Sequence, residues 1–345
     1  MKNFYIGKIG RVVGGLRGRF GQRAAILMYH RITDYVSNPY LLCVTPHHFA
    51  EHLQVIRDIG YPMRLDELAR GVRDGNLPQR AMCVTFDDGY ADTLYTAKPL
   101  LERYDVPATV FMTTGTSGRS REFWWDELER IFLQPGCLPA HLQLDGGGQH
   151  FAWDLGDSSI YSEDDFHRGK NWTLLESSDP TPRHAVLRAV HELILSMGAA
   201  DRQQVLDRLL NWAGMAPMVR ATHRALEPDE IVNLDRGGIV EVGSHTVNHL
   251  ALSTQPSQVQ REEIQPSKAD LEGWLEHAVR SFAYPHGLYT RESVAFVREV
   301  GFEYACACLY RPVRPSSDLF LLPRVSVFNW DGDEFACHLR AWIGC

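Results

Sequence analysis

The sequence of 345 residues contains no run of about 18 apolar residues, the length that a membrane-spanning helix needs. It has no Gly-x-Gly-x-x-Gly after any predicted strand and no Gly-Lys-Ser/Thr loop, so we expect no nucleotide cofactor. It also lacks an excess of basic residues. The net charge is -8, which argues against nucleic acid as a partner, because phosphate binding needs a basic surface. The remaining composition, 44% apolar and 23% charged, is that of an ordinary globular protein.

The sequence has no Cys-x-x-Cys pair, and the number of its cysteines is odd. There are seven: Cys43, Cys83, Cys137, Cys306, Cys308, Cys337 and Cys345. We interpret them as reduced, mostly buried thiols, which favours a cytoplasmic protein. Cys306 and Cys308 share one face of a predicted strand, where a core role is favoured over a metal role.

Residues 1–23 form a basic arm with six Lys or Arg side chains and no acidic one. The arm lacks the apolar stretch and the cleavage site of a secretory signal. Its composition fits either a solvated terminus or peripheral contact with an anionic membrane surface. We therefore expect a cytoplasmic location, with the inner membrane face as the alternative.

Predicted strands alternate with amphipathic helices, which indicates an α/β fold with a parallel sheet and right-handed crossovers. One helix has well-marked ends, because Thr45 and Pro46 suit its first positions and Gly60 its last. Another, over 258–278, contains Pro266, which is expected to kink or split it. The strands expected are 24–30, 80–86, 106–112, 239–243, 281–284, 304–309 and 322–327. They fit a distorted (β/α) barrel better than an open doubly wound sheet.

This alternation stops near residue 115 and resumes near residue 226. The segment between carries a predicted hairpin around 145–148 and two helices, at about 182–197 and 201–212. We interpret it as a mostly helical insertion packed beside the barrel. The domains expected are the basic arm, the first barrel part, the insertion and the second barrel part: 1–23, 24–114, 115–226 and 227–345.

Two polar stretches follow predicted strands at distant places in the chain. Thr85–Tyr90 (TFDDGY) closes one apolar run, and Gly243–His249 (GSHTVNH) closes another. Barrels and open α/β sheets keep their chemistry just past the C-terminal ends of their strands. Adjacent carboxylates with two histidines spaced four apart suit a hydrolytic divalent-metal site.

Each pattern alone has a simpler explanation. Asp87 and Asp88 also fit a solvated acidic turn that caps a helix, and an isolated His-x-x-x-His is weak evidence of a metal. At a strand end the two carboxylates should point in different directions, so that one binds metal and the other acts as a base. His245 and His249 should meet on one face of a helical turn. The combination of the two stretches favours the metal site.

Three motifs resemble those of the NodB-like polysaccharide deacetylases, carbohydrate esterase family 4. They are Thr85–Gly89, Ser244–His249 and Phe282–Gly287 (FAYPHG), and they follow the family's order. The resemblance covers roughly residues 24–330. It implies a distorted (β/α)7 barrel of the NodB-homology type and a metal-dependent hydrolase that removes N-acetyl groups from sugars.

Carried over position by position, the resemblance implies a role for each motif residue. Asp88, His245 and His249 would bind a divalent ion, Zn²⁺ in the first place, with Co²⁺, Ni²⁺ or Mn²⁺ as alternatives. Asp87 would be the general base that takes a proton from water. A backbone N–H near His286 would stabilise the oxyanion together with the metal.

Four other residues are expected beside the substrate. Tyr284 and Pro285 belong to the third motif, and Tyr90 directly follows the first. Trp125 opens the insertion near the predicted mouth of the barrel. Its indole either stacks on a sugar ring or is buried at the start of a helix.

The sequence departs from the family pattern in two places. Ala283 stands where many members carry an arginine that orients the base, and Arg324 is the candidate to replace it, unless it lies on a solvated rim. The family's late proton-donor histidine is not evident, and His338 on a predicted terminal helix is a poor substitute. We assign the donor to His30, because Ile26–Arg31 resembles the opening of a permuted branch in which this histidine comes first.

The expected substrate is an N-acetylated sugar in a polysaccharide or a glycan precursor. One alternative is a related hydrolase that cuts another non-peptide C–N bond in a small molecule. The other is a metal-free carbohydrate-binding protein that keeps the barrel without its chemistry. Four polar groups at one barrel mouth argue against that scaffold, because burying such groups is costly.

Overall fold

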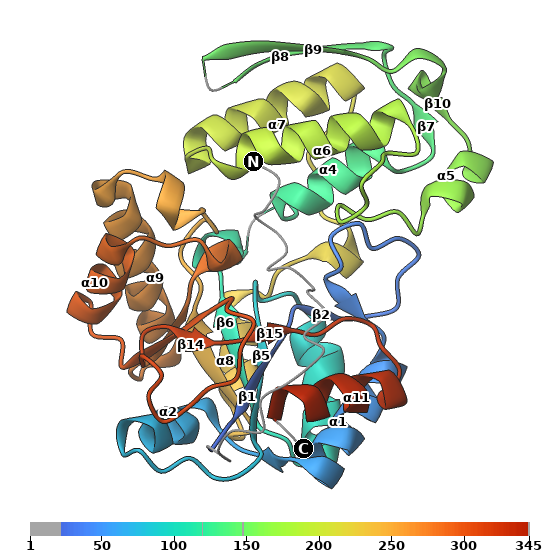
Figure 1. Cartoon of the computed structure of the whole chain (residues 1–345). Helices are drawn as coiled ribbons and strands as arrows, with labels where there is room; N and C mark the ends of the chain where they lie inside the picture. The colour runs from blue at the N-terminus through green and yellow to red at the C-terminus, as the bar shows by residue number, and fades with distance from the viewer. Residues whose placement is uncertain (1–21, 119, 147, 344–345) are drawn as a thin grey trace.

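A computed structural model describes residues 22–118, 120–146 and 148–343 (Figure 1). The predicted basic arm, 1–23, therefore falls almost entirely outside the described residues. Figure 1 shows a barrel in the lower half and a mainly helical layer above it. Within the described ranges, no helix is both long and apolar enough to cross a membrane.

Parallel strands form the wall of the barrel. In pairing order they are β14 (Leu322–Pro323), β13 (Tyr304–Ala307), β12 (Ser281–Ala283), β11 (Val240–Ser244), β6 (Ala108–Met112), β5 (Ala81–Phe86), β1 (Ala25–Tyr29) and β15 (Val325–Ser326). Arg324 alone separates β14 from β15. One bent strand therefore pairs with β13 on one side and with β1 on the other, which closes the barrel.

Because β14 and β15 are halves of one strand, the eight strands on this path occupy seven positions around the barrel. The short strand β4 (Tyr61–Pro62) pairs with β5 off this path. The sequence-based prediction of a distorted (β/α)7 barrel is confirmed.

Helices cover the outside of the barrel and close its lower end (Figure 1). They are α1 (Pro46–Ile59), α2 (Leu65–Arg73), α3 (Lys98–Tyr104), α8 (Pro228–Asp235), α9 (Ser257–Leu275), α10 (Arg291–Glu299) and α11 (Gly332–Ile343). Helix α1 has the predicted ends, since the Thr45 hydroxyl accepts a hydrogen bond from the His48 amide at 3.3 Å. Pro266 was expected to kink or split its helix, and the helix is not split. Helix α9 continues through Pro266, because packing against α8 and α10 outweighs one missing backbone hydrogen bond.

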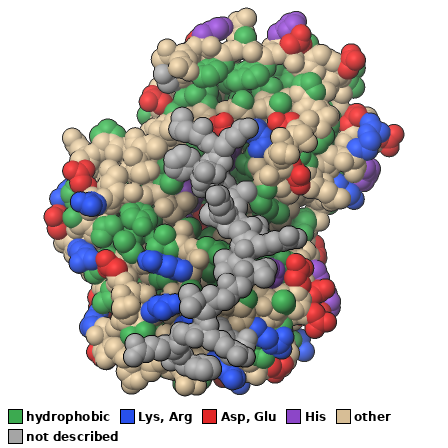
Figure 2. Space-filling view, viewed as in Figure 1, with side chains coloured by type: hydrophobic (Ala, Val, Ile, Leu, Met, Phe, Trp, Pro, Cys, Tyr) green, Lys and Arg blue, Asp and Glu red, His purple; other side chains and the backbone are tan. Residues whose placement is uncertain are grey.

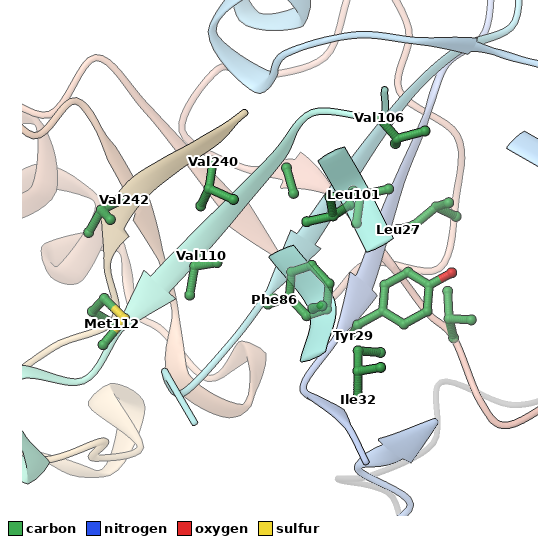
Figure 3. Close-up of a cluster of buried hydrophobic side chains, with 14 of the residues drawn as sticks. Leu27, Tyr29, Ile32, Phe86, Leu101, Val106, Val110, Met112, Val240 and Val242 are labelled. Carbon is green, nitrogen blue, oxygen red and sulfur yellow. The ribbon is translucent and has the colours of Figure 1, made fainter. Parts of the chain in front are cut away.

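Successive side chains of each barrel strand face opposite sides of the wall. Leu27, Tyr29, Phe86 and Val110 belong to the largest core, which lies between the strands and the outer helices (Figure 3). The alternate residues, such as Ile26, Cys83 and Phe111, fill the barrel interior. This alternation decides which residues past the strand ends face the barrel mouth.

Residues 115–226 contain the predicted hairpin and both predicted helices. The elements are α4 (Trp124–Phe132), β7 (Gly136–Cys137), β8 (His141–Gly146), β9 (Gln149–Asp154), β10 (Ile160–Tyr161), α5 (Glu163–Gly169), α6 (Pro182–Leu195) and α7 (Ala199–Ala213). Strands β8 and β9 pair antiparallel. Most of their buried apolar residues form a second core, distinct from the cores of the barrel. This core supports 115–226 as a proposed insertion between proposed barrel parts 24–114 and 227–345.

Six cysteines lie within the described residues, all as free thiols. Three of them are buried and three exposed: Cys43, Cys83 and Cys306, then Cys137, Cys308 and Cys337. The prediction of mostly buried thiols is therefore wrong for half of this set. Cys306 belongs to the barrel interior as expected, whereas Cys308 follows the end of β13 and reaches the barrel mouth.

On the face shown in Figure 2, acidic and basic side chains are interspersed.

Candidate active site

The C-terminal ends of β1, β5 and β15 bring three inward-facing rows of side chains together. Met28 pairs in register with Thr85 on one side and with Ser326 on the other. Continuing each strand by two residues places His30 and Asp87 on the same inner side. Both residues line one cavity at the barrel mouth.

Asp87 is held by Arg324, a residue that sequence reasoning offered as its partner. The Arg324 guanidinium donates to the two carboxylate oxygens at 2.6 and 2.7 Å, and also to the Thr85 hydroxyl at 3.2 Å. The Asp87 and Arg324 side chains are both buried, so the alternative of a solvated rim is wrong. Burial alone would raise the pKa of Asp87, but the guanidinium, assisted by His245, lowers this pKa below its usual value.

Asp88 points into the same site as Asp87, in contrast to the prediction that the two would diverge. Its backbone has a φ of 72°, in the left-handed region, which turns its side chain back towards the barrel mouth. Asp88 Oδ1 lies 3.8 Å from His245 Nε2 and 3.2 Å from His249 Nε2. Burial raises the pKa of Asp88.

His245 and His249 meet, but not on a helical turn. The segment after β11 is irregular, with left-handed φ values of 67° at Thr246 and 53° at His249. The Thr246 hydroxyl accepts a hydrogen bond from the His249 amide at 3.0 Å. The two rings stand 4.8 Å apart, centroid to centroid. The predicted proximity is correct and the predicted helical geometry is wrong.

The protonation of both histidines suits metal binding. His245 Nδ1 donates to the Ala283 carbonyl oxygen at 2.8 Å, which leaves the lone pair on Nε2, the nitrogen that faces Asp87 and Asp88. Burial lowers the pKa of His245 and, more strongly, that of His249. Both rings are therefore neutral near pH 7, as ligands must be.

The residues present fit a divalent ion. Asp88, His245 and His249 offer one ligand atom each, and these atoms lie within 4.8 Å of one another. Asp88 Oδ1 is buried with no hydrogen-bond partner among the described residues. A buried carboxylate oxygen in that state is costly, and a cation removes the cost. Two imidazoles and one carboxylate form a donor set that is typical of catalytic zinc.

Two buried charged residues hold the loop between the histidines. Glu263 of α9 accepts hydrogen bonds from the backbone amide and from the side-chain amide of Asn248, both at 2.7 Å. Arg202 of α7 donates to the carbonyl oxygens of Asn248 and His249 at 2.5 and 3.4 Å. A barrel helix and a helix of the proposed insertion therefore both bind this loop.

The cavity at the barrel mouth has a volume of about 320 Å³ and contains most of the predicted site residues. Trp125 lines it, buried at the start of α4, with its ring 4.9 Å from that of His249. His286 lines it too, on a backbone with a φ of 56°. The amides of Gly287 and Leu288 donate to backbone carbonyls within the same loop. These two amides are thus engaged, and the oxyanion donor, a backbone N–H near His286, stays a prediction.

Three predicted substrate residues do not line this cavity. Tyr90 is fully buried, and its hydroxyl joins Trp125 Nε1 to the Asp126 carboxylate through bonds of 2.7 Å each. The Tyr284 ring packs in the outer core, and its hydroxyl donates to the Phe320 carbonyl oxygen. Pro285 is buried. The strand alternation turns Tyr284 outward, so these assignments are corrected to structural roles.

Sequence reasoning missed three residues of the site. His191 of α6 lines the cavity, where its ring stacks on that of Tyr40 with centroids 5.6 Å apart. Arg202 and Glu263 hold the histidine loop from helices far away in the sequence. All three occupy ordinary positions of amphipathic helices, and no local motif marks them.

Comparison with known proteins adds a family to this geometry. The profile of the polysaccharide deacetylase family matches residues 74–138 and 209–305. These ranges contain Asp87, Asp88, His245 and His249, whereas His30 and Arg324 lie outside them. YxkH of Bacillus subtilis (strain 168), provisionally described as a polysaccharide deacetylase, is 27% identical over 150 residues. That match takes in 41% of this chain and 52% of YxkH, so the chain spans about half the length of this curated relative.

Solved structures with the same fold extend over nearly the whole chain. The deacetylase PplD of Streptococcus pyogenes, solved with acetate, has a TM-score of 0.57 at 18% identity, over 92% of this chain and 99% of PplD. IcaB of Ammonifex degensii has a TM-score of 0.58 at 17% identity, over 94% of this chain and 98% of IcaB. These likenesses show the fold, and the profile match covers the metal-ligand motifs. The chain thus carries the polysaccharide deacetylase profile over these two ranges, on the fold of known deacetylases.

Proposed function

We propose that this protein is a metal-dependent hydrolase that removes N-acetyl groups from an N-acetylated sugar in a polysaccharide or a glycan precursor. The observation that carries this proposal is a buried Asp88–His245–His249 donor cluster beside a second carboxylate, Asp87, which Arg324 keeps ionised. The match to the polysaccharide deacetylase profile supports the reaction class.

The proposed ion is Zn²⁺, with Co²⁺, Ni²⁺ or Mn²⁺ as alternatives, held by Asp88, His245 and His249. When bound, such an ion supplies Lewis-acid activation of water and of an amide carbonyl. PplD, which has this fold, is a deacetylase whose structure was solved in complex with acetate.

Asp87 has the properties of a general base. Its carboxylate stays ionised because Arg324 lowers its pKa, and it lies 3.8 Å from the metal-facing nitrogen of His245. In that position it accepts a proton from the attacking water. Arg324 fixes both carboxylate oxygens, so the base keeps one orientation throughout the reaction.

His30 is the proposed proton donor to the leaving amine. It follows β1, the strand that pairs with β5 just before Asp87 and Asp88, and it lines the same cavity as these carboxylates. The profile match does not include residue 30, so this assignment and the permuted branch remain our proposal.

Acetate release tests the function. The purified protein, stripped with a chelator and reloaded with Zn²⁺, should release acetate from N-acetylhexosamine oligomers and lose this activity on chelation. Asp87→Asn should abolish turnover while the protein still binds one equivalent of zinc. A protein that binds no ion on titration would favour the metal-free carbohydrate-binding alternative. Hydrolysis that is confined to small amides without a sugar would favour the alternative of a hydrolase that cuts another non-peptide C–N bond in a small molecule.

A further inference from the structure

Much of the wall of the active-site cavity is apolar. Apart from Asp87, Asp88, Arg324 and five histidines, none of the described residues that line it carries a charged or an amide side chain. Much of the wall is leucine: Leu41, Leu42, Leu174, Leu175 and Leu288. Met28, Val327 and Phe328 add further apolar surface near the end of the barrel.

Four of these leucines, Leu41, Leu42, Leu174 and Leu175, lie on two distant loops that a backbone hydrogen bond joins. The Leu174 amide donates to the Pro39 carbonyl oxygen at 2.9 Å, which joins the segment after α5 to residues 38–42. Within that loop, the Leu42 amide donates to the Asn38 side chain at 2.9 Å. The apolar wall is therefore part of the folded structure, with one side from the barrel and one from the proposed insertion.

The cavity is buried at its metal end and open at the other. Asp88 and His245 are 2% and 1% exposed, whereas Leu175 is 36% and Tyr310 55% exposed. Tyr310 lines the cavity, and its hydroxyl accepts a hydrogen bond from Trp342 Nε1 at 3.0 Å. Apolar surface thus continues from the metal ligands to solvent.

We infer that the substrate is an N-acetylated sugar joined to a lipid, with the hydrocarbon chain lying along the leucine wall. This inference rests on the proposed function. The reacting amide must sit at the buried metal end, so the outer walls face whatever the sugar is attached to. A further sugar there would bring hydroxyl groups, each of which loses water and needs a partner. Leucine side chains offer none.

The same reasoning argues against a long N-acyl group as the reason for the apolar wall. The acyl carbon is bound at the ligand cluster, which is the closed end of the cavity. A chain that grows from that carbon starts among buried polar residues, whereas a chain attached to the sugar starts nearer the open end. The wall therefore suits the lipid of a glycolipid better than a fatty acyl group.

Two substrate series test the inference. In the first, β-alkyl glycosides of N-acetylglucosamine carry methyl, butyl or octyl groups. In the second, N-acyl chains of increasing length are attached to one methyl glycoside. In both series the rate is followed by the free amine, since the acid released is acetate in the first and the longer fatty acid in the second. We expect kcat/KM to rise in the first series by up to about fourfold per buried methylene, as burial of a CH₂ group predicts. The second series should show no such gain, and N-acetylglucosamine oligomers should be poorer than the octyl glycoside.

A pair of variants separates the wall from general effects on the fold. The double variant Leu41→Ser/Leu175→Ser should lower kcat/KM for the octyl glycoside at least tenfold and leave the methyl glycoside within twofold. Ile160→Ser, on the proposed insertion and 67% exposed, is the matched control and should change neither value. Equal rates on all alkyl glycosides, a gain along the acyl series, or a preference for oligomers would overturn the inference while leaving deacetylation intact.

Binding measurements separate this inference from the proposed function. The zinc-loaded Asp87→Asn variant should bind the octyl glycoside at least tenfold more tightly than the methyl glycoside in calorimetry. Absence of acetate release from every substrate by the wild-type protein would sink the proposed function. If this variant binds the octyl and methyl glycosides with equal affinity, the lipid inference is refuted, whatever the turnover of the wild-type protein.

Discussion

Arg324 and Asp87, 237 residues apart in the chain, form a buried two-point ion pair with nitrogen–oxygen distances of 2.6 and 2.7 Å. The pair exists because the bent strand β14–β15 closes the barrel beside β1 and β5. It places a permanent positive charge against the proposed base in a site where burial would otherwise favour the neutral acid.

Removal of this charge should change the pH dependence of the reaction. In Arg324→Met, burial would raise the pKa of Asp87 with less opposition, so the base would be protonated at higher pH. We expect the acidic limb of the kcat/KM profile to move upward by at least one pH unit, with metal saturating throughout. Arg324→Lys, which restores a single charge, should recover part of the shift. An unchanged acidic limb in the Met variant would refute the role of Arg324 as the partner of the base.

The hydrogen bonds from Arg202 to the loop between His245 and His249 should affect metal affinity. Arg202→Met removes the donors to the Asn248 and His249 carbonyl oxygens. Because the loss of groups that orient metal ligands typically weakens affinity by about 10- to 100-fold, we expect zinc to bind at least ten times more weakly. Competitive zinc titration measures this. Arg208→Met is the matched control, since Arg208 is exposed on the same helix and donates a hydrogen bond to the Asp145 carbonyl oxygen, away from the histidine loop. Equal zinc affinity in both variants would leave Arg202 with no part in shaping the site.

His30 should matter most for substrates with poor leaving groups. His30→Gln should lower kcat for an N-acetylated amino sugar by about 10²- to 10⁴-fold, the usual contribution of a general acid or base. An aryl acetate, whose leaving group needs no proton, should lose far less, and zinc binding should be unchanged. His338→Gln is the control. His338 lies in α11, its ring stacks on that of Trp330 with centroids 4.1 Å apart, and it is not among the residues that line the cavity. Equal losses for both substrates would rule out proton donation by His30.

Asp126 should make the protein less stable as pH rises. Burial raises the pKa of Asp126 to about 7, above its ordinary value of 3.8, so the folded protein holds a proton that the unfolded chain releases. Stability is therefore complete below about pH 4, falls as pH rises to about 7, and is level above that.

Asp126→Asn should remove this decline, because an amide keeps an acceptor for the Tyr90 hydroxyl without a titrating proton. We expect a gain on the order of 2 kcal/mol at pH 8 relative to pH 5. Urea unfolding at the two pH values measures it. Asp145→Asn is the control, since the Asp145 side chain is 75% exposed. The same pH slope in wild type and Asp126→Asn would assign the decline to another group.

Local sequence was sufficient for the barrel class and for the metal ligands. Buried parallel strands are continuous apolar runs, and residues just past their ends must gather at one barrel mouth. Asp88, His245 and His249 therefore met as expected. The ends of α1 were equally predictable, because Thr45, Pro46 and Gly60 act on the backbone within one turn.

Long-range packing decided what local pattern could not. The histidine loop is irregular because Glu263 and Arg202 satisfy its amides and carbonyls, which a sequence of five residues cannot reveal. Tyr284 faces outward because strand alternation, rather than its place in a motif, sets its direction.

From the sequence alone, the chain had to form a parallel barrel with carboxylates and imidazoles at its mouth, since hydrophobic pattern and strand ends are local properties. Only the tertiary structure decided that Arg324 holds Asp87, that the proposed insertion supplies His191 and Arg202, and that leucines from two distant loops line the cavity. These are contacts between residues distant in sequence. They depend on how the barrel closes and what packs over its mouth.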